Sequence, residues 1–162
     1  MAALDRHDLT VHMDPLPRVT TDIRQLWQGG HPKEPNLWAR FDQVGRDHWL
    51  GPALDHQEWR RPDRAAGSTY EFDGRYVTDE AGFLCALGEA VNGPGGYFGR
   101  SLAGVSDALC GGFGATEPFT LVWRDHEVAR RCLGVQPLVA RPSAFPELLA
   151  FLRERRVDVV LE

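Results

Sequence analysis

The run Phe119-Thr120-Leu121-Val122-Trp123 decides the fold class of this chain. It is almost continuously apolar and is bounded by Pro118 and Arg124, without the polar alternation of a half-exposed strand. Parallel strands that are covered by helices on both faces have sequences of this kind. The run therefore predicts a central parallel strand with both faces buried.

Two further strands are expected, one before this run and one after it. Thr69–Phe72 leads into the turn pair Asp73-Gly74, and Val157–Leu161 is a short apolar segment. Between the strands, apolar residues recur at helical spacing. Helices are therefore expected over residues 79–91, 101–110, 125–133 and 145–155. Strands that alternate with helices imply right-handed crossovers, so the expected fold class is α/β, a small three-stranded parallel sheet flanked by helices.

Two of these helices are expected to start at a hydroxyl side chain. Thr78 precedes the first helix, whose first turn contains Asp79 and Glu80, and Ser143 precedes the last helix. A side-chain oxygen at this position accepts a hydrogen bond from one of the free N–H groups of the first turn. Thr78 and Ser143 are therefore the predicted N-caps.

Residues 1–67 differ in composition from the rest of the chain. They contain four of the five Trp residues and two turn-rich stretches, at residues 29–32 and 62–67, the second interpreted as a linker. The apolar segment Asn36–Trp59 is short and interrupted by Gly and Pro, so it cannot hold a core of its own. We therefore expect a partly ordered, Trp-rich N-terminal extension over residues 1–67 and an α/β domain over residues 68–162. The segment Asn36–Trp59 is expected to dock its Trp side chains onto the rest of the protein.

Composition and charge restrict the class of protein. The 162 residues carry a formal net charge of −5, whereas unspecific nucleic-acid binders need an excess of Lys and Arg. The first residues lack the basic start and apolar run of a signal peptide. No apolar stretch approaches the roughly 20 residues that cross a bilayer. A soluble cytoplasmic protein with no nucleic-acid or membrane partner is expected.

The sequence contains no enzymatic or metal-binding motif. His48 and His56 are assigned to a loop-like region and His7, His12 and His31 to an irregular stretch, without the spacing of a zinc site. The widely spaced Cys residues favour reduced, buried thiols. Gly93–Gly99 precedes a helix, as a phosphate-binding loop does, but it lacks the Lys-Ser/Thr ending of a P-loop. No catalytic residue, cofactor or metal is expected.

The segment from Gly96 to Phe113 is the most informative for function. It reads Gly-Tyr-Phe-Gly-Arg-Ser-Leu-Ala-Gly-Val-Ser-Asp-Ala-Leu-Cys-Gly-Gly-Phe. With its aromatic pair and Gly, its polar residue and Leu, and its Asp-x-Leu followed by Gly, it resembles the barstar family of intracellular ribonuclease inhibitors. The upstream strand and helix, the strand ending in Trp-Arg and the terminal strand also fit. The resemblance covers about residues 68–162.

The resemblance implies a mechanism and a set of contact residues. A ribonuclease cleft is rich in Arg, Lys and His, and carboxylates that enter it form charge-assisted hydrogen bonds. The resemblance places Asp107 at the dominant inhibitory aspartate and Tyr97 at a contact tyrosine. The other contact positions that it implies are Gly99, Ser101, Leu102, Ala103, Ser106, Phe113 and, across a gap, Glu154. The implied partner is a secreted microbial, guanyl-specific, barnase-like ribonuclease, bound one to one and blocked by an acidic helix and loop.

The chain departs from the family pattern at two of these positions. Ala103 stands where the family usually has a second Asp, and Ser106 replaces a large aromatic residue. Arg100 adds a positive charge nearby. These departures predict a lower affinity for a barnase-type enzyme.

Three functions are therefore compared. The first is ribonuclease inhibition through Asp107. The second keeps the barstar fold but changes the target, as in an immunity protein for another toxin or a module whose partner docks on the extension. The third is a small α/β enzyme that uses the loop Gly93–Gly99. The sequence favours the first, a protein that inhibits an enzyme and is not itself one.

Overall fold

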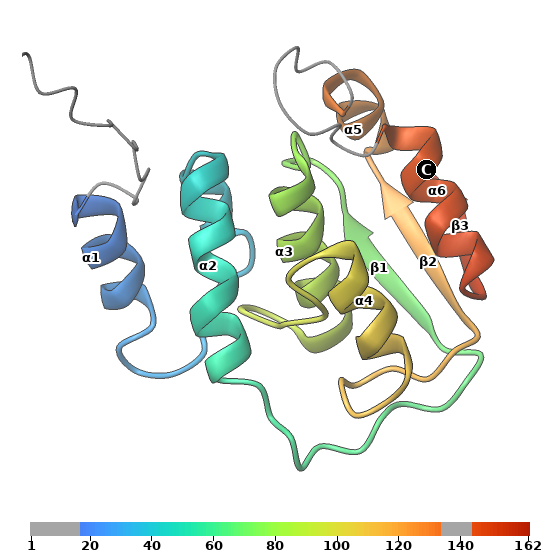
Figure 1. Cartoon of the computed structure of the whole chain (residues 1–162), viewed down its shortest axis with the longest axis horizontal. Helices are drawn as coiled ribbons and strands as arrows, with labels where there is room; N and C mark the ends of the chain where they lie inside the picture. Colours follow the sequence, from blue (N-terminus) through green and yellow to red (C-terminus); the bar gives the residue numbers. More distant parts are fainter. Residues whose placement is uncertain (1–16, 134–143) are drawn as a thin grey trace, which may run out of the picture.

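The computed structural model describes residues 17–133 and 144–162. Figure 1 shows a helical N-terminal part beside a small sheet with its own helices. The elements in chain order are α1 (Pro17–Leu26), the 3-10 helix η1 (Leu37–Arg40), α2 (Gln43–Asp55), β1 (Thr69–Asp73), α3 (Glu80–Asn92), α4 (Leu102–Leu109), β2 (Phe119–Arg124), α5 (His126–Cys132), α6 (Phe145–Glu154) and β3 (Val157–Leu161). The expected cap Ser143 and two histidines, His7 and His12, lie outside the described residues.

The three strands form one parallel sheet in the order β1-β2-β3. Leu121 of the central strand is paired with Tyr70 on one side and with Val159 on the other. This arrangement confirms the predicted α/β fold with a three-stranded parallel sheet and a central strand at residues 119–124.

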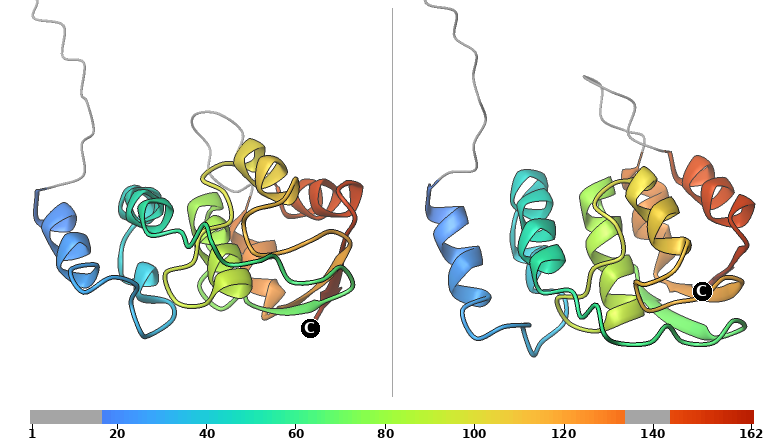
Figure 2. Two further views of the ribbon diagram at one scale, coloured as in Figure 1. Left: turned by 90° about the horizontal axis from the view of Figure 1, so that it is seen from below. Right: turned by 60° about the horizontal axis from the view of Figure 1, so that its bottom comes forward.

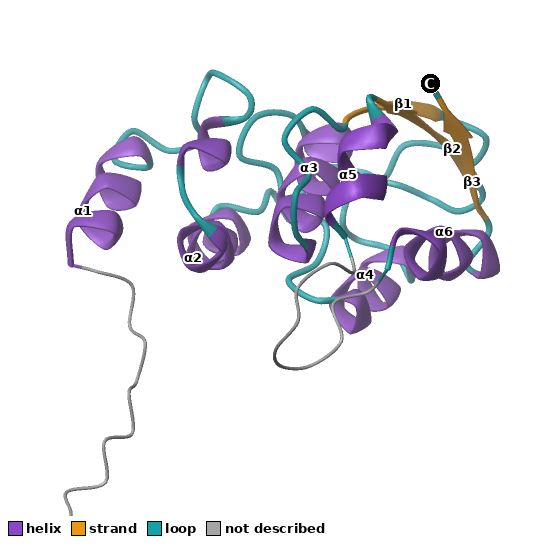
Figure 3. Ribbon diagram, turned by 90° about the horizontal axis from the view of Figure 1, so that it is seen from above, coloured by secondary structure: helices purple, strands orange, loops and turns teal. Residues whose placement is uncertain are grey.

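Helices cover only one face of this sheet (Figure 3). Alternate side chains of β2, ending with Trp123, are buried on that face, whereas Thr120 and Val122 are half-buried and Arg124 is exposed on the other. The prediction that both faces of the central strand are buried is therefore wrong. Thr and Val favour strands because they are β-branched, also on a face that solvent reaches.

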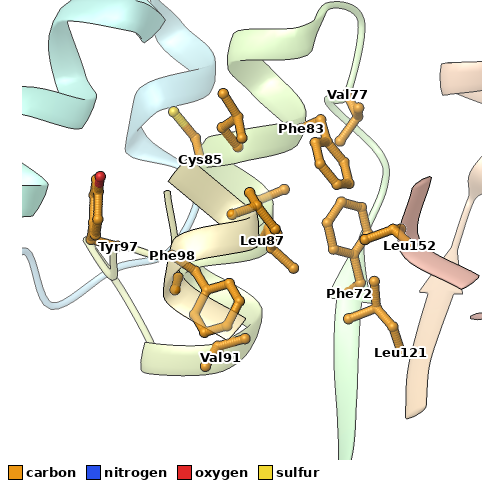
Figure 4. Packing of buried hydrophobic residues seen from close by; sticks show 14 of the residues in the cluster. Phe72, Val77, Phe83, Cys85, Leu87, Val91, Tyr97, Phe98, Leu121 and Leu152 are labelled. Carbon is orange, nitrogen blue, oxygen red and sulfur yellow. The ribbon is translucent and has the colours of Figure 1, made fainter. Parts of the chain in front are cut away.

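An aromatic cluster fixes α3 on the covered face. The ring centroid of Phe72 lies 4.5 Å from that of Trp123 and 5.7 Å from that of Phe83. All three side chains are fully buried, and Figure 4 shows Leu87 of α3 in the same layer. Burial of such a side chain stabilises the fold by about 1.5–3 kcal/mol. The cluster therefore fixes α3 against β1 and β2.

The cap of α3 differs from the one predicted. Asp79 is the N-cap, because its Oδ1 accepts a hydrogen bond of 2.7 Å from the amide of Gly82. Thr78 is wrong as the predicted cap, since its hydroxyl accepts a hydrogen bond from Arg46 instead. Arg46 also forms an ion pair of 2.7 Å with Asp79. The start of α3 is thus tied to α2.

The N-terminal extension packs against α3 and shares the core of the sheet region. Figures 1 and 2 show α2 alongside α3, and one hydrophobic cluster runs through both parts. The predicted docking of Trp side chains is confirmed for Trp38 and Trp49, which are at most 1% exposed, but not for Trp59, which is 61% exposed. The division at residue 67 stays a prediction, because the core is continuous across it.

Two helices of the extension were not predicted from the sequence. In α1, Val19, Ile23 and Leu26 lie at helical spacing behind Pro17, a signal that was available. The helix α2 continues through Pro52 and contains His48, so the assignment of His48 to a loop-like region is wrong. The burial of residues 49, 50 and 53 stabilises this helix and outweighs the destabilisation that Pro52 causes inside it.

Candidate functional site

The loop before α4 is shaped by two short-range features. Ser101 is the N-cap of α4, and its hydroxyl accepts a hydrogen bond of 3.0 Å from the amide of Gly104. Gly99 has a φ of 113°, and a Cβ there would lie 2.6 Å from the amide nitrogen of Val105. Only Gly fits this conformation and this approach. Ser101 and Gly99, both predicted contact positions, therefore have structural roles in presenting α4.

Asp107 lies exposed in the last turn of α4. Within residues 17–133 and 144–162 its carboxylate has no hydrogen-bond or ion-pair partner. A negative charge at the C-terminal end of a helix opposes the helix dipole and costs about 0.3–1 kcal/mol. Stability of the fold therefore does not explain this residue, which leaves the carboxylate available to a partner.

The position of Ser106 is linked to the end of α6. Its hydroxyl accepts a hydrogen bond of 2.7 Å from Nε of Arg155. The guanidinium of Arg155 lies 3.7 Å from the centroid of the Phe151 ring and 4.0 Å from the carboxylate of Glu154. Arg155 thus links Glu154 to α4, while the partner contact of Glu154 that the resemblance implies stays a prediction. Sequence analysis did not predict that the guanidinium of Arg155 lies beside α4, because Arg155 is 49 residues from Ser106 in sequence.

The aromatic pair before α4 divides between core and surface. Figure 4 shows Phe98 directed toward Val91, while Tyr97 points away from that part of the core. Tyr97 is nevertheless only 7% exposed, which limits direct contact with a partner to a small part of its ring. Burial raises the pKa of the Tyr97 phenol, the Arg100 guanidinium opposes the shift, and the Asp107 carboxylate adds to it. Tyr97 is therefore mainly a core residue whose phenol lies within the electrostatic influence of Asp107.

Two predicted contact residues lie at the edges of this group. Phe113 is half-buried, and its ring centroid lies 5.9 Å from that of Tyr97. Leu102, in the first turn of α4, is half-buried against the core. The structure thus brings Tyr97 and Phe113 together, and it places Asp107 near one end of α4 and Leu102 and Ala103 at the other.

The glycine-rich loop before Tyr97 is not arranged to bind phosphate. The amide of Gly95 donates a hydrogen bond of 3.1 Å to Oε2 of Glu89, and the amide of Gly96 donates one of 2.8 Å to the carbonyl of Gly93. A phosphate-binding loop needs free amides directed at the ligand. These contacts remove the feature on which the small-enzyme hypothesis rests.

Glu89 joins this loop to the N-terminal extension. Its Oε1 accepts hydrogen bonds of 2.7 Å from the amide of Asn36 and 2.6 Å from the indole of Trp38. Burial raises the pKa of this carboxyl, although the three N–H groups that donate to it oppose the shift. The extension therefore supports the loop in which Tyr97 lies, a contact that no local sequence pattern indicates.

The extension also reaches the surface around Phe113. The ring centroid of Trp59 lies 5.1 Å from that of Phe113, edge to face. Arg100, at the start of the α4 loop, lies 3.9 Å from Asp47 of α2, so part of its charge is balanced within the chain. The candidate face, which comprises α4 with Asp107, Phe113 after it and the adjoining Trp59, therefore contains residues of both parts of the protein.

Searches for other kinds of site add little. No group of three or more His, Cys, Asp and Glu residues that could hold a metal occurs in the two described ranges. Of the three thiols, Cys85 is buried as predicted, whereas Cys110 is exposed and Cys132 half-buried, which corrects the prediction that all are buried. None of the described helices has the length and apolar character needed to cross a membrane.

Comparison with known proteins gives one finding. The family model of Barstar (barnase inhibitor) matches residues 68–159, more than half of the chain. A search of curated proteins and a search of solved structures each found no significant match. The matched range contains β1, β2 and the whole α4 segment and ends within β3, and it leaves out α1, η1 and α2.

Proposed function

The chain belongs to the Barstar (barnase inhibitor) family, and from this premise we propose that it inhibits a secreted microbial, guanyl-specific ribonuclease. The inhibitor binds the enzyme one to one in the cytoplasm of the producing cell and covers the active-site cleft with α4 and the loops around it. It performs no catalysis of its own.

The observation that carries the proposal is the exposed, unpaired carboxylate of Asp107 at the end of α4. A cleft that binds RNA presents Arg, Lys and His side chains, and a carboxylate that enters it replaces a substrate phosphate. Charge-assisted hydrogen bonds of this kind are about twice as strong as neutral ones. Opposite potentials also accelerate the encounter of the two proteins.

Asp107→Asn is the matching test. We expect affinity to fall by at least about 30-fold, because removing one partner of a hydrogen-bonded interfacial charge pair costs about 2–5 kcal/mol. The measurement is isothermal titration against a panel of secreted microbial guanyl-specific ribonucleases, together with an RNA-cleavage assay. Asp158→Asn, an exposed change on the open face of the sheet, is the control and should leave affinity unchanged.

Binding to a ribonuclease with equal affinity for wild type and Asp107→Asn would contradict the proposed role of Asp107. Binding to no member of the panel would favour the second candidate, an immunity protein or binding module of the same fold with a different target. Two positions on α4 support that candidate. Ala103 has a methyl group where the family usually has a carboxylate, and Ser106 has a hydroxyl bound to the cation of Arg155 where the family usually has an aromatic ring.

A further inference from the structure

Trp59 is the most exposed of the large apolar side chains in the described chain. It is 61% exposed, compared with 41% for Tyr76 and 44% for Val160. One edge of its ring packs against Phe113, while most of its surface faces solvent. Burying a large aromatic side chain is among the strongest single contributions to protein association. An indole left in water beside a binding face therefore needs an explanation.

The segment that carries Trp59 is held on the loop after α4. The carboxylate of Asp63 accepts hydrogen bonds of 2.8 Å from the amide of Gly112 and 2.7 Å from that of Gly114. The amide of Arg64 donates a hydrogen bond of 3.0 Å to the carbonyl of Gly114. Figures 1 and 2 show this segment, between α2 and β1, running beside that loop. Since the backbone is already fixed, Trp59 loses less entropy when a partner covers it.

Trp59 also lies beside the segment that carries Asp107. Its ring contacts Phe113, which follows α4, and the ring centroid of Phe113 lies 5.9 Å from that of Tyr97, which precedes α4. A partner that covers Asp107 and the rim at Phe113 therefore reaches Trp59 next.

The charges around Trp59 indicate what it contacts. Arg60 and Arg61 adjoin it and are exposed, and Arg61 lies 3.0 Å from Glu58. Because Glu58 balances one of the two, one net positive charge remains beside Trp59. This charge repels a cationic side chain, so this end of the face does not fit the basic cleft itself. An apolar patch bordered by carboxylates fits both the indole and its neighbours.

We propose that Trp59 is a second anchor of the inhibitory interface, contributed by the extension, and that it packs on an apolar, acid-bordered patch of the ribonuclease beside its basic cleft. This inference rests on the proposed function. It goes beyond that function because residues 1–67 lie outside the matched family region.

The test uses the full-length protein and the same ribonuclease panel. Trp59→Ala should lower affinity by roughly 30-fold, as expected of an interfacial anchor, with no change in the urea unfolding midpoint. Tyr76→Ala is the matched control, since Tyr76 is also exposed but lies beyond the carboxyl end of β1, away from Gly114. In addition, iodide should quench the fluorescence of Trp59 in the free protein and not in the complex, with Trp59→Phe identifying its signal.

The outcomes separate the two proposals. Loss of affinity in both Asp107→Asn and Trp59→Ala supports both. Loss in Asp107→Asn alone, with Trp59 still quenched in the complex, overturns the role of Trp59 and leaves ribonuclease inhibition intact. Failure of every ribonuclease to bind the wild type overturns both proposals.

Discussion

Replacing Trp38 by Ala tests whether the N-terminal extension is part of the same cooperative core as the sheet. Trp38 lies in η1 and is completely buried. Its indole packs near Gly82 of α3, donates a hydrogen bond of 2.6 Å to Glu89 and lies under the guanidinium of Arg46. Each of these contacts joins the extension to α3 or stabilises that junction.

The expected cost follows from these contacts. Truncating a buried Trp to Ala removes about 3–5 kcal/mol from the free energy of unfolding. Trp38→Phe keeps one aromatic ring but removes the N–H donor and part of the ring volume, so we expect it to cost at least about 1.5–3 kcal/mol, the contribution of the hydrogen bond to the carboxylate. The free energy of unfolding of a natural domain is about 5–15 kcal/mol. Trp38→Ala therefore removes a large part of the total.

Urea unfolding followed by far-UV circular dichroism measures this effect. The control is Trp59→Ala, which removes the same side chain from an exposed site of the same segment and should stay within about 0.5 kcal/mol of wild type. The reasoning is refuted if Trp38→Ala lowers stability no more than Trp59→Ala. A separate early transition that alone responds to Trp38→Ala would also refute it, because the extension would then unfold independently.

Two further predictions concern charge. Because the pKa of Glu89 is raised in the folded state, the folded chain holds this proton more tightly than the unfolded chain. The associated stability is present below pH 4.5, the usual pKa, and is lost as pH rises through the folded pKa. Urea unfolding should show that the stability advantage of wild type over Glu89→Gln shrinks with rising pH, and a constant difference would contradict this prediction. Ala103→Asp adds a carboxylate on the exposed side of α4, one turn before Asp107. It should raise affinity for a ribonuclease about 10-fold at low salt and less at high salt. A titration that shows no gain in affinity at low salt would argue against a basic cleft facing α4.

The sheet region could be predicted because its signals are local. Apolar runs at 119–123 and 157–161 and the helical spacing at 79–91 each identify an element by themselves, and the observed elements agree with them within one or two residues. The covered face could not be predicted, because Thr120 and Val122 are compatible with either environment. The cap at Asp79 was missed because Thr78 is also of a preferred cap residue type, and the ion pair of Asp79 with Arg46 is a tertiary contact.

The candidate site could be predicted only where it follows the family pattern. The contact roles of Asp107, Tyr97 and Phe113 stay predictions from that pattern, whereas Arg155, Trp59 and Asp63 reach α4 and the loop after it from distant parts of the chain. Such long-range partners leave no periodicity in the sequence. An exposed Trp and a buried Trp also look alike in sequence, which is why Trp59 was grouped with Trp38 and Trp49.

The extension holds the α4 segment at both of its ends. Before the segment, Glu89 links the amide of Gly95 to Trp38, and after it Asp63 binds the amides of Gly112 and Gly114. The aspartate and the aromatic residue absent at Ala103 and Ser106 lie on α4 itself, whereas the added indole of Trp59 lies on the extension. Under the two proposals, α4 therefore contributes less to the binding free energy than the family pattern implies, and the extension contributes more. It follows that restoring the family residues on α4 and removing Trp59 should have opposite effects on affinity for the same ribonuclease.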